Sequence, residues 1–291
     1  MPAGAILSYE LRGLLANWLV RIWFVASVVL TLLILAAHWA STPTTLMLRE
    51  LLFPYLLFPW FLVVMVLGIS PVTGSRLDSL ADGILSRPIT RYEYLLAAWA
   101  ARVAIVLGVY LSVMVPVVLL AMYAKRDVAQ DTVTVYGALS TLTVVGLIQV
   151  FLVTLGFLVG TLLRHPLLAA VVLIFTWMPV NWVFSTFDLA QFSPWTMYQA
   201  VPSLLRTPWR TAESDEDQAS AQLMDDAEAL AKFISVLTGQ SPAPVSQARQ
   251  ESFFDPREFP HLSVPRILAG YGLPALAALF VSLVVFHRRD L

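Results

Sequence analysis

The chain contains no cysteine among its 291 residues, so it can form neither a disulfide framework nor a thiolate nucleophile. Lysine is nearly as scarce, because Lys125 and Lys232 are the only two and each follows an alanine. A phosphate-binding loop needs Gly-Lys-Ser or Gly-Lys-Thr, so nucleotide hydrolysis by that route is excluded. The four histidines are scattered and form no His-Glu-x-x-His pair, which leaves a zinc hydrolase without support. We therefore expect no enzyme activity, no catalytic or metal site and no cofactor.

Charge is also scarce. Charged residues make up 13% of the chain and hydrophobic residues 58%, whereas a soluble domain has about a quarter and about half, respectively. Six segments contain no Asp, Glu, Lys or Arg, and each is longer than the roughly 20 residues that a helix needs to cross a membrane. These segments are residues 22–48, 51–75, 103–124, 132–163, 165–187 and 267–287. The composition therefore indicates a multi-pass membrane protein with six spans.

The fold class follows from these long runs. Strands of a membrane β-barrel would be about 10 residues long and would alternate apolar with polar residues, which these runs do not do. We expect an all-α polytopic protein with six transmembrane helices and an amphipathic interfacial helix at residues 6–23, with Trp18 and Trp23 at the depth of the headgroups. The alternative is that residues 6–23 are only the cytoplasmic end of span one.

The chain divides into three regions. Residues 1–187 hold the interfacial helix and spans one to five, with a polar segment at 71–92; residues 188–265 form a long loop; residues 266–291 form span six and a tail. Six spans place both termini on one side. Eight arginines lie on that side, against three basic residues in the opposite short loops, so the positive-inside rule predicts cytoplasmic termini. The eight are Arg12, Arg21, Arg76, Arg87, Arg91, Arg164, Arg288 and Arg289.

The polar segment between spans two and three has helix signals of its own. Ser75 and Asp78 fit a capping box that starts a short helix at Arg76, and Pro88 ends it. Its spacing gives one apolar face and one polar face. The apolar face contains Leu77, Leu80, Ala81, Ile84 and Leu85, and the polar face contains Asp78, Ser79, Asp82 and Ser86.

A second capping box, Thr90 with Glu93, opens the third span. We thus expect a three-turn amphipathic helix that lies flat on the membrane face and joins span three by a tight elbow. On pattern alone, such a connector can simply cover the end of the bundle, with Arg87 and Arg91 as ordinary positive anchors.

The stretch "LDSLADGILSRPITRYEYLLAAWAAR" resembles the cytoplasmic segment of type-2 ABC transporter permeases, the export class that includes the permease of nitrous oxide reductase maturation. The match is best at Ser86–Arg91, "SRPITR", whereas Ser79 and Leu80 stand where that family usually has Gly-Thr. The N-terminal "YELRGLL" and the terminal "FHRRDL" are similar to the two ends of the same family. The resemblance does not cover residues 188–265.

This resemblance implies a role for the polar segment: a coupling helix that docks in a groove of a separate cytoplasmic ATPase. The ATPase-coupling residues that it implies are Leu77, Asp78, Leu80, Asp82, Ile84, Leu85, Arg87, Pro88 and Arg91. It also implies a bacterial inner-membrane location and a dimer with a second permease copy or a homologue. Other partners are membrane lipids and an extracytoplasmic protein; a net charge of −1 gives no nucleic-acid signature.

The apolar runs contain no carboxylate, although ion-coupled transporters usually carry ionisable groups within the bilayer. Arg102, about two turns into the third helix, is expected to reach the cytoplasm by snorkelling. The absence of carboxylates from the apolar runs favours a transporter that is energised from outside the membrane over an ion-coupled one. Gly156 and Gly160 form a Gly-x-x-x-Gly spacing, which fits either close packing inside the bundle or a dimer contact.

Residues 188–265 carry eleven acidic and five basic side chains, a net charge of −6. The aromatic and proline-rich start of this loop is expected to rest at the outer membrane interface, and residues 223–237 have the spacing of one amphipathic helix. The loop is too small and too polar to form an independent hydrophobic core, so packing on the bundle or on a partner would have to complete that core. It could receive exported material or hold an extracytoplasmic protein, or it could only cap the bundle.

We therefore expect the permease subunit of an ATP-driven exporter that couples hydrolysis by a separate ATPase to substrate movement. The first alternative is a membrane scaffold that transmits ATPase-driven motion to an extracytoplasmic partner without moving a solute. A second is a membrane enzyme with its site on the acidic loop.

Overall fold

The computed structural model describes residues 2–69, 90–124, 126, 133–163, 165, 167–176, 193–206 and 264–288. Within these residues every regular element is a helix, which confirms the all-α class for this part of the chain. The labelled helices are α1 (Pro2–Ala16), α2 (Trp18–His38), α3 (Thr44–Leu56), α4 (Trp60–Ile69), α6 (Arg91–Tyr123), α7 (Val135–Leu162), α9 (Pro194–Arg206) and α11 (Val264–Arg288). A shorter apolar helix covers Leu167–Thr176.

Within the described residues, five stretches are long and apolar enough to cross a membrane. They are Trp18–His38, Thr44–Ile69, Tyr92–Tyr123, Val135–Leu162 and Val264–Phe286. The predicted span at 165–187 is represented by the helix Leu167–Thr176, which is shorter than the roughly 20 residues that a crossing needs. Residues 177–192 lie outside the described part of the chain, so the sixth span stays a prediction.

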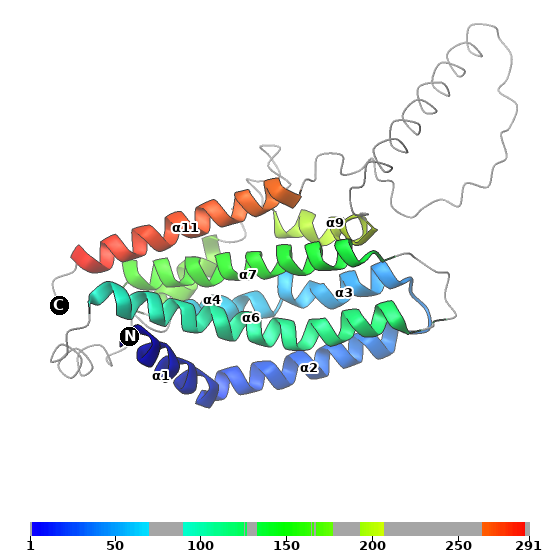
Figure 1. The fold of residues 1–291 in the computed structure, drawn as a ribbon, viewed down its shortest axis with the longest axis horizontal. Helices are drawn as coiled ribbons and strands as arrows, with labels where there is room; N and C mark the ends of the chain where they lie inside the picture. Colours follow the sequence, from blue (N-terminus) through cyan, green and yellow to red (C-terminus); the bar gives the residue numbers. More distant parts are fainter. Residues whose placement is uncertain are drawn as a thin grey trace, which may run out of the picture.

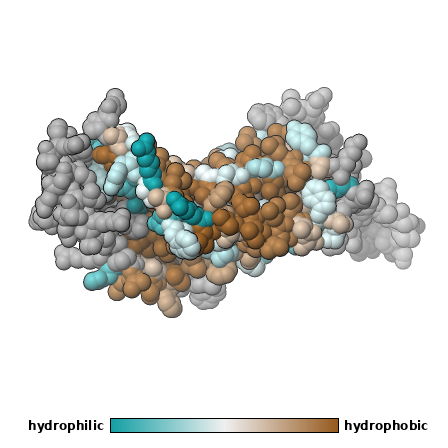
Figure 2. All heavy atoms as spheres, turned by 90° about the horizontal axis from the view of Figure 1, so that it is seen from below, coloured by the Kyte–Doolittle hydropathy of each residue, from teal (hydrophilic) through white to brown (hydrophobic). Residues whose placement is uncertain are grey.

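The long helices run side by side, with α7 in the middle of the bundle (Figure 1), where it packs against α4, α6, α9 and α11. Helix α1 packs on α6. Helix α1, the start of α6 and the last turn of α11 lie at one end of the bundle, here called the α1 end; α9 lies toward the opposite end, called the α9 end. Apolar residues cover most of the middle of the face in Figure 2, as expected for a surface in contact with lipid.

Asn17 separates α1 from α2, and this break corrects the single helix predicted over residues 6–23. The side chain of Asn17 accepts a hydrogen bond of 3.0 Å from the Leu19 N–H, and its backbone is extended, as at an ordinary N-cap. The break places Trp18 and Trp23 on one helix. Trp18 is exposed and can lie among the headgroups, whereas Trp23 is buried in the core and cannot.

The boundary between the first two spans also differs from the prediction. Span one ends at His38 and the chain turns over residues 39–43, so residues 44–48 belong to the second span, which runs over α3 and α4. The charge-free runs had placed that boundary at Arg49 and Glu50. Both residues instead lie inside α3, where their charges are paired.

Helices α4 and α7 touch backbone to backbone. A Cβ atom added at Gly156 would lie 2.5 Å from the Met65 carbonyl oxygen, and one at Gly160 would lie 2.9 Å from that of Ile69. Gly68 of α4 faces the same seam, since its Cβ would lie 2.5 Å from the Val153 carbonyl oxygen. The Gly-x-x-x-Gly pair is therefore used within the chain, where small residues allow the close approach. It gives no support to the dimer interpretation.

Helix α9 covers the start of the long loop and packs against α3 and α7. It buries a full apolar face that includes Met197, Val201, Leu204 and Leu205. Residues 193–206 thus pack on the bundle, which is one of the two ways in which the loop was expected to complete a core. The helix predicted over 223–237 lies outside the described residues.

Candidate functional site

The predicted coupling residues lie almost entirely outside the described part of the chain. Those outside are Leu77, Asp78, Leu80, Asp82, Ile84, Leu85, Arg87 and Pro88. Arg91 is described as the first residue of α6. The three-turn helix and the capping box at Ser75 therefore stay predictions, and what the structure provides is the element to which that segment connects.

Helix α6 begins with the predicted capping box. The Thr90 hydroxyl accepts a hydrogen bond of 3.3 Å from the Glu93 N–H, and the Glu93 carboxylate accepts one of 3.1 Å from the Thr90 N–H. These reciprocal bonds satisfy N–H groups that a helix start leaves unpaired. From this start α6 runs for 33 residues. The end of the polar segment is thus fixed directly to one long membrane helix.

Arg102 ties three helices together at the α1 end. Its guanidinium lies 3.5 Å from Glu10 of α1, and its Nε–H donates a hydrogen bond of 3.2 Å to the Leu67 carbonyl in the last turn of α4. A third bond, of 2.6 Å, goes to the Ala98 carbonyl on α6 itself. The Arg102 side chain is only 5% exposed. The expectation that it snorkels to the cytoplasm is therefore wrong, because its hydrogen bonds are made inside the bundle.

An apolar cluster supports the start of α6 on its other side. Leu95 of α6, Phe157 of α7 and Phe286 of α11 are buried together, and Trp99 packs on them. The Trp99 indole N–H also donates a hydrogen bond of 3.1 Å to the Thr154 hydroxyl of α7. The first three turns of α6 are therefore held against α7 and α11 as well as against α1 and α4.

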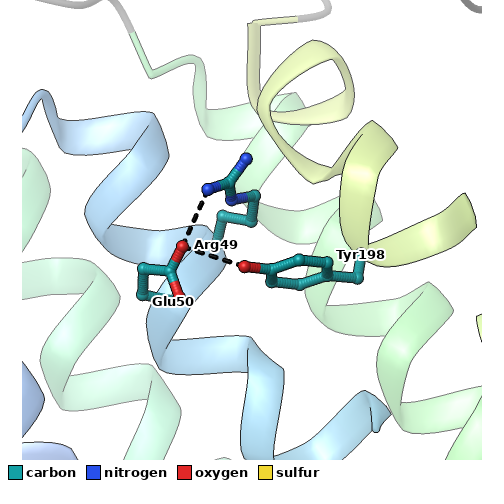
Figure 3. A network of polar contacts seen from close by, with 3 residues as sticks. All are labelled: Arg49, Glu50 and Tyr198. Atoms are coloured by element: carbon teal, nitrogen blue, oxygen red, sulfur yellow. Dashed lines mark hydrogen bonds and ion pairs between the residues drawn. The ribbon is translucent and has the colours of Figure 1, made fainter. Parts of the chain in front are cut away.

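A charged group that the sequence reading missed lies at the α9 end (Figure 3). One oxygen of Glu50, Oε1, accepts a hydrogen bond of 2.9 Å from the Tyr198 hydroxyl and pairs with the Arg49 guanidinium at 2.8 Å. The same guanidinium lies over the Tyr198 ring, 5.0 Å from its centroid. Arg49 and Glu50 come from α3, and Tyr198 comes from α9. The Glu50 carboxylate thus contacts one cation, Arg49, and one uncharged hydrogen-bond donor, Tyr198.

The Tyr198 hydroxyl stays protonated in this setting. Burial and then the hydrogen bond and negative charge of Glu50 raise the pKa of Tyr198 from 10.0 to about 12, although Arg49 acts in the opposite direction. The ring also packs edge-on against Phe53, with centroids 5.3 Å apart. Tyr198 is therefore a hydrogen-bond donor at any physiological pH.

The other end of α9 is attached to α7. The Leu205 carbonyl accepts a hydrogen bond of 3.0 Å from the Thr134 N–H and one of 3.3 Å from its hydroxyl. Thr134 is also the N-cap of α7, because its hydroxyl accepts a bond of 2.9 Å from the Gly137 N–H. Helix α9 thus bridges α3 and α7.

Arg126 closes the turn between α2 and α3. It donates to the carbonyl of His38 at 3.1 Å and of Thr42 at 2.8 Å, bonds the Trp39 carbonyl, and lies over the Trp39 ring. These bonds go to carbonyls at the end of α2 and in the turn, of which the His38 carbonyl also accepts a bond of 3.2 Å from the Thr42 N–H. Arg126, three residues after the end of α6, therefore contacts the turn that joins the first two spans.

None of these groups forms a catalytic constellation. Among the described residues, no three His, Cys, Asp or Glu side chains lie close enough together to hold a metal ion. The polar clusters instead connect helices: Glu10 and Arg102 at the α1 end, and Glu50 and Tyr198 at the α9 end. These contacts hold neighbouring helices in position.

The sequence contained a signal for the missed group, namely the adjacent opposite charges of Arg49 and Glu50 between two apolar runs. Such a pair can neutralise itself within a helix, so it need not mark a loop. No local pattern pointed to Tyr198.

No protein-family model matches the chain, and no curated protein matches it in sequence.

Proposed function

We propose that the chain is the membrane subunit of an ATP-driven exporter, with residues 71–92 as the contact for a separate cytoplasmic ATPase. The observation that carries the proposal is the start of α6. The capping box of Thr90 and Glu93 fixes the end of the polar segment to a helix of 33 residues. A displacement of that segment has to move α6.

The bonds of Arg102 extend this connection. Because Arg102 binds Glu10 of α1 and the Leu67 carbonyl of α4, a movement of α6 is passed to two further helices near the same end. Helix α4 is in turn locked to α7 along the glycine seam. Force applied at residues 71–92 therefore has a continuous path of close contacts into the core of the bundle.

At the α9 end the same bundle holds the start of the acidic loop. Helix α9 is attached to α3 through Glu50 and to α7 through Thr134. In an exporter this arrangement relates motion of the spans to the loop on the far side, where exported material would be received.

The test of ATPase coupling is copurification. The tagged chain should carry a nucleotide-binding subunit with it out of native membranes, and the triple variant Ile84→Asp, Leu85→Asp, Arg87→Glu should retain at least tenfold less of that subunit. Arg12→Gln is the control, because it alters an exposed charge on α1 at the same end of the bundle but outside residues 71–92. Equal recovery with the triple variant and the wild type would contradict the proposal.

Orientation can be tested on the same chain. Because the natural sequence has no cysteine, Ser86→Cys and Ser214→Cys each provide a single label site without further changes. A membrane-impermeant maleimide added to intact cells should label the position in the acidic loop and not the position in the polar segment. Labelling at position 86 from outside would place the segment on the wrong side for an ATPase.

Whether a solute moves is a separate question. Reconstituted complexes with ATPase activity but without vectorial transport of any candidate would favour the scaffold that only transmits motion.

A further inference from the structure

A groove lies between the α1–α2 elbow and the middle of α6. Its volume is about 530 Å³, which is within the range of about 300–1,000 Å³ for sites that bind small molecules. Its walls are apolar: Val20, Phe24 and Val25 come from α2, and Ile105 and Gly108 come from α6. Among the described residues that line it, Arg21 is the charged one.

The elbow creates this groove. Asn17 ends the helical path of α1 and starts α2 in a new direction, and α1 stays with α6 through the ion pair of Glu10 and Arg102. On the α6 side, Gly108 leaves space, because a Cβ atom built there would meet nothing within 4 Å.

Arg21 is held at the elbow by a bond to the backbone. Its Nε–H donates a hydrogen bond of 3.0 Å to the Leu15 carbonyl, one of the carbonyls that the end of α1 leaves unpaired. Within the residues that the structure describes, no carboxylate lies within ion-pair distance of Arg21. The remaining guanidinium N–H groups suit an oxygen anion, with which arginine forms strong charge-assisted bonds.

The positions of the charge and of the apolar wall match the shape of a phospholipid. Arg21 lies in the first turn of the span Trp18–His38, at the level where a membrane helix meets the headgroups. The apolar wall on α6 extends from Ala104 to Ser112, about 12 Å along the helix axis. A cation at the headgroup level thus continues into an apolar channel that runs along the span.

We propose that this groove binds one anionic membrane phospholipid, with its phosphate against Arg21 and an acyl chain along α6. Such a lipid would fill the space between the elbow and α6 and so stabilise the angle between α1 and α2. The site does not depend on the exporter proposal, because it can be occupied in the isolated chain.

Native mass spectrometry of the full-length chain, titrated with phosphatidylglycerol or with phosphatidylcholine of equal chain length, tests this site. We expect one phosphatidylglycerol to be retained in preference to phosphatidylcholine. Arg21→Gln should weaken that retention about fivefold, the factor expected for one cation facing an anionic lipid. Gly108→Phe should abolish retention of both lipids, because the ring occupies the groove.

Two controls separate the groove from general effects. Arg12→Gln removes an equal charge from an exposed position on α1 that does not line the groove. Gly272→Phe adds an equal ring to α11 at a glycine that also has open space. Both should retain phosphatidylglycerol as the wild type does. Three results would each overturn the proposal: equal retention of the two lipids, unchanged retention in Arg21→Gln, or a dimer of the chain that carries no lipid. If Gly108→Phe does not fold, the comparison of Arg21→Gln with Arg12→Gln still decides it.

Discussion

Tyr198 of α9 donates a hydrogen bond of 2.9 Å to Glu50 of α3, a residue 148 positions earlier in the chain. The bond joins the start of the acidic loop to the second membrane-length segment. Because Glu50 Oε1 also pairs with Arg49, the acceptor is a charged carboxylate, and hydrogen bonds to charged groups are stronger than neutral ones. The contact therefore fixes α9 against the bundle.

Removing this bond should destabilise the folded chain. We expect Tyr198→Phe to lower the free energy of unfolding by about 1.5 kcal/mol, the lower end of the range for bonds to charged groups, since Glu50 and Arg49 are partly exposed. Glu50→Gln should cost a similar amount, and the double variant should cost less than the sum of the two. Denaturant unfolding in detergent measures the cycle, with Tyr9→Phe, at an exposed tyrosine, as the control. Additive losses would mean that the two side chains are not coupled.

The setting of Tyr198, first its burial and then its bond to Glu50, predicts a dependence on alkaline pH. The pKa of Tyr198 is raised from 10.0 to about 12 in the folded chain, so folding favours the protonated phenol. The resulting stabilisation is fully present below pH 10 and is lost as the pH rises toward 12. The melting temperature of the wild type should therefore fall more steeply than that of Tyr198→Phe across this window. Parallel curves for the two proteins would show that the phenol ionises at its ordinary pKa.

The glycine seam between α4 and α7 should tolerate no larger side chain. Gly156→Leu would bring a Cβ atom to 2.5 Å from the Met65 carbonyl oxygen, so the helices would have to separate. We expect a loss of about 1–3 kcal/mol in unfolding free energy, as for other overpacked sites. Gly272→Leu is the matched control within a membrane-length helix, because its Cβ would meet nothing within 4 Å. A dimer that dissociates while the monomer keeps its stability would instead assign the seam to an interface between chains.

Much of the helical framework follows from the sequence, for an identifiable physical reason. Lipid leaves backbone groups without partners, so a long apolar run has to be a helix. The start of α6 was predicted to the residue because Thr90 and Glu93 satisfy each other's N–H groups locally. Signals of this kind depend only on neighbours in the chain.

The boundaries that were wrong depend on partners far away in the sequence. Arg49 and Glu50 were assigned to a loop because charge is costly in a membrane, but Tyr198 and their own pairing make them acceptable within α3. Arg102 was expected to reach the headgroups, yet Glu10 and the Leu67 carbonyl provide its bonds inside the bundle. The coupling residues and the sixth span concern parts of the chain outside the described residues and stay predictions.

The glycine seam also limits which motions are available to the bundle. Two helices in backbone contact cannot slide past each other without a clash, so we expect α4 and α7 to move as one rigid unit. We expect bending at the breaks between helices instead: the interruption between α3 and α4 at residues 57–59, and the elbow at Asn17. A movement of α6 that reaches α4 through the bond of Arg102 to the Leu67 carbonyl would therefore carry α7 with it.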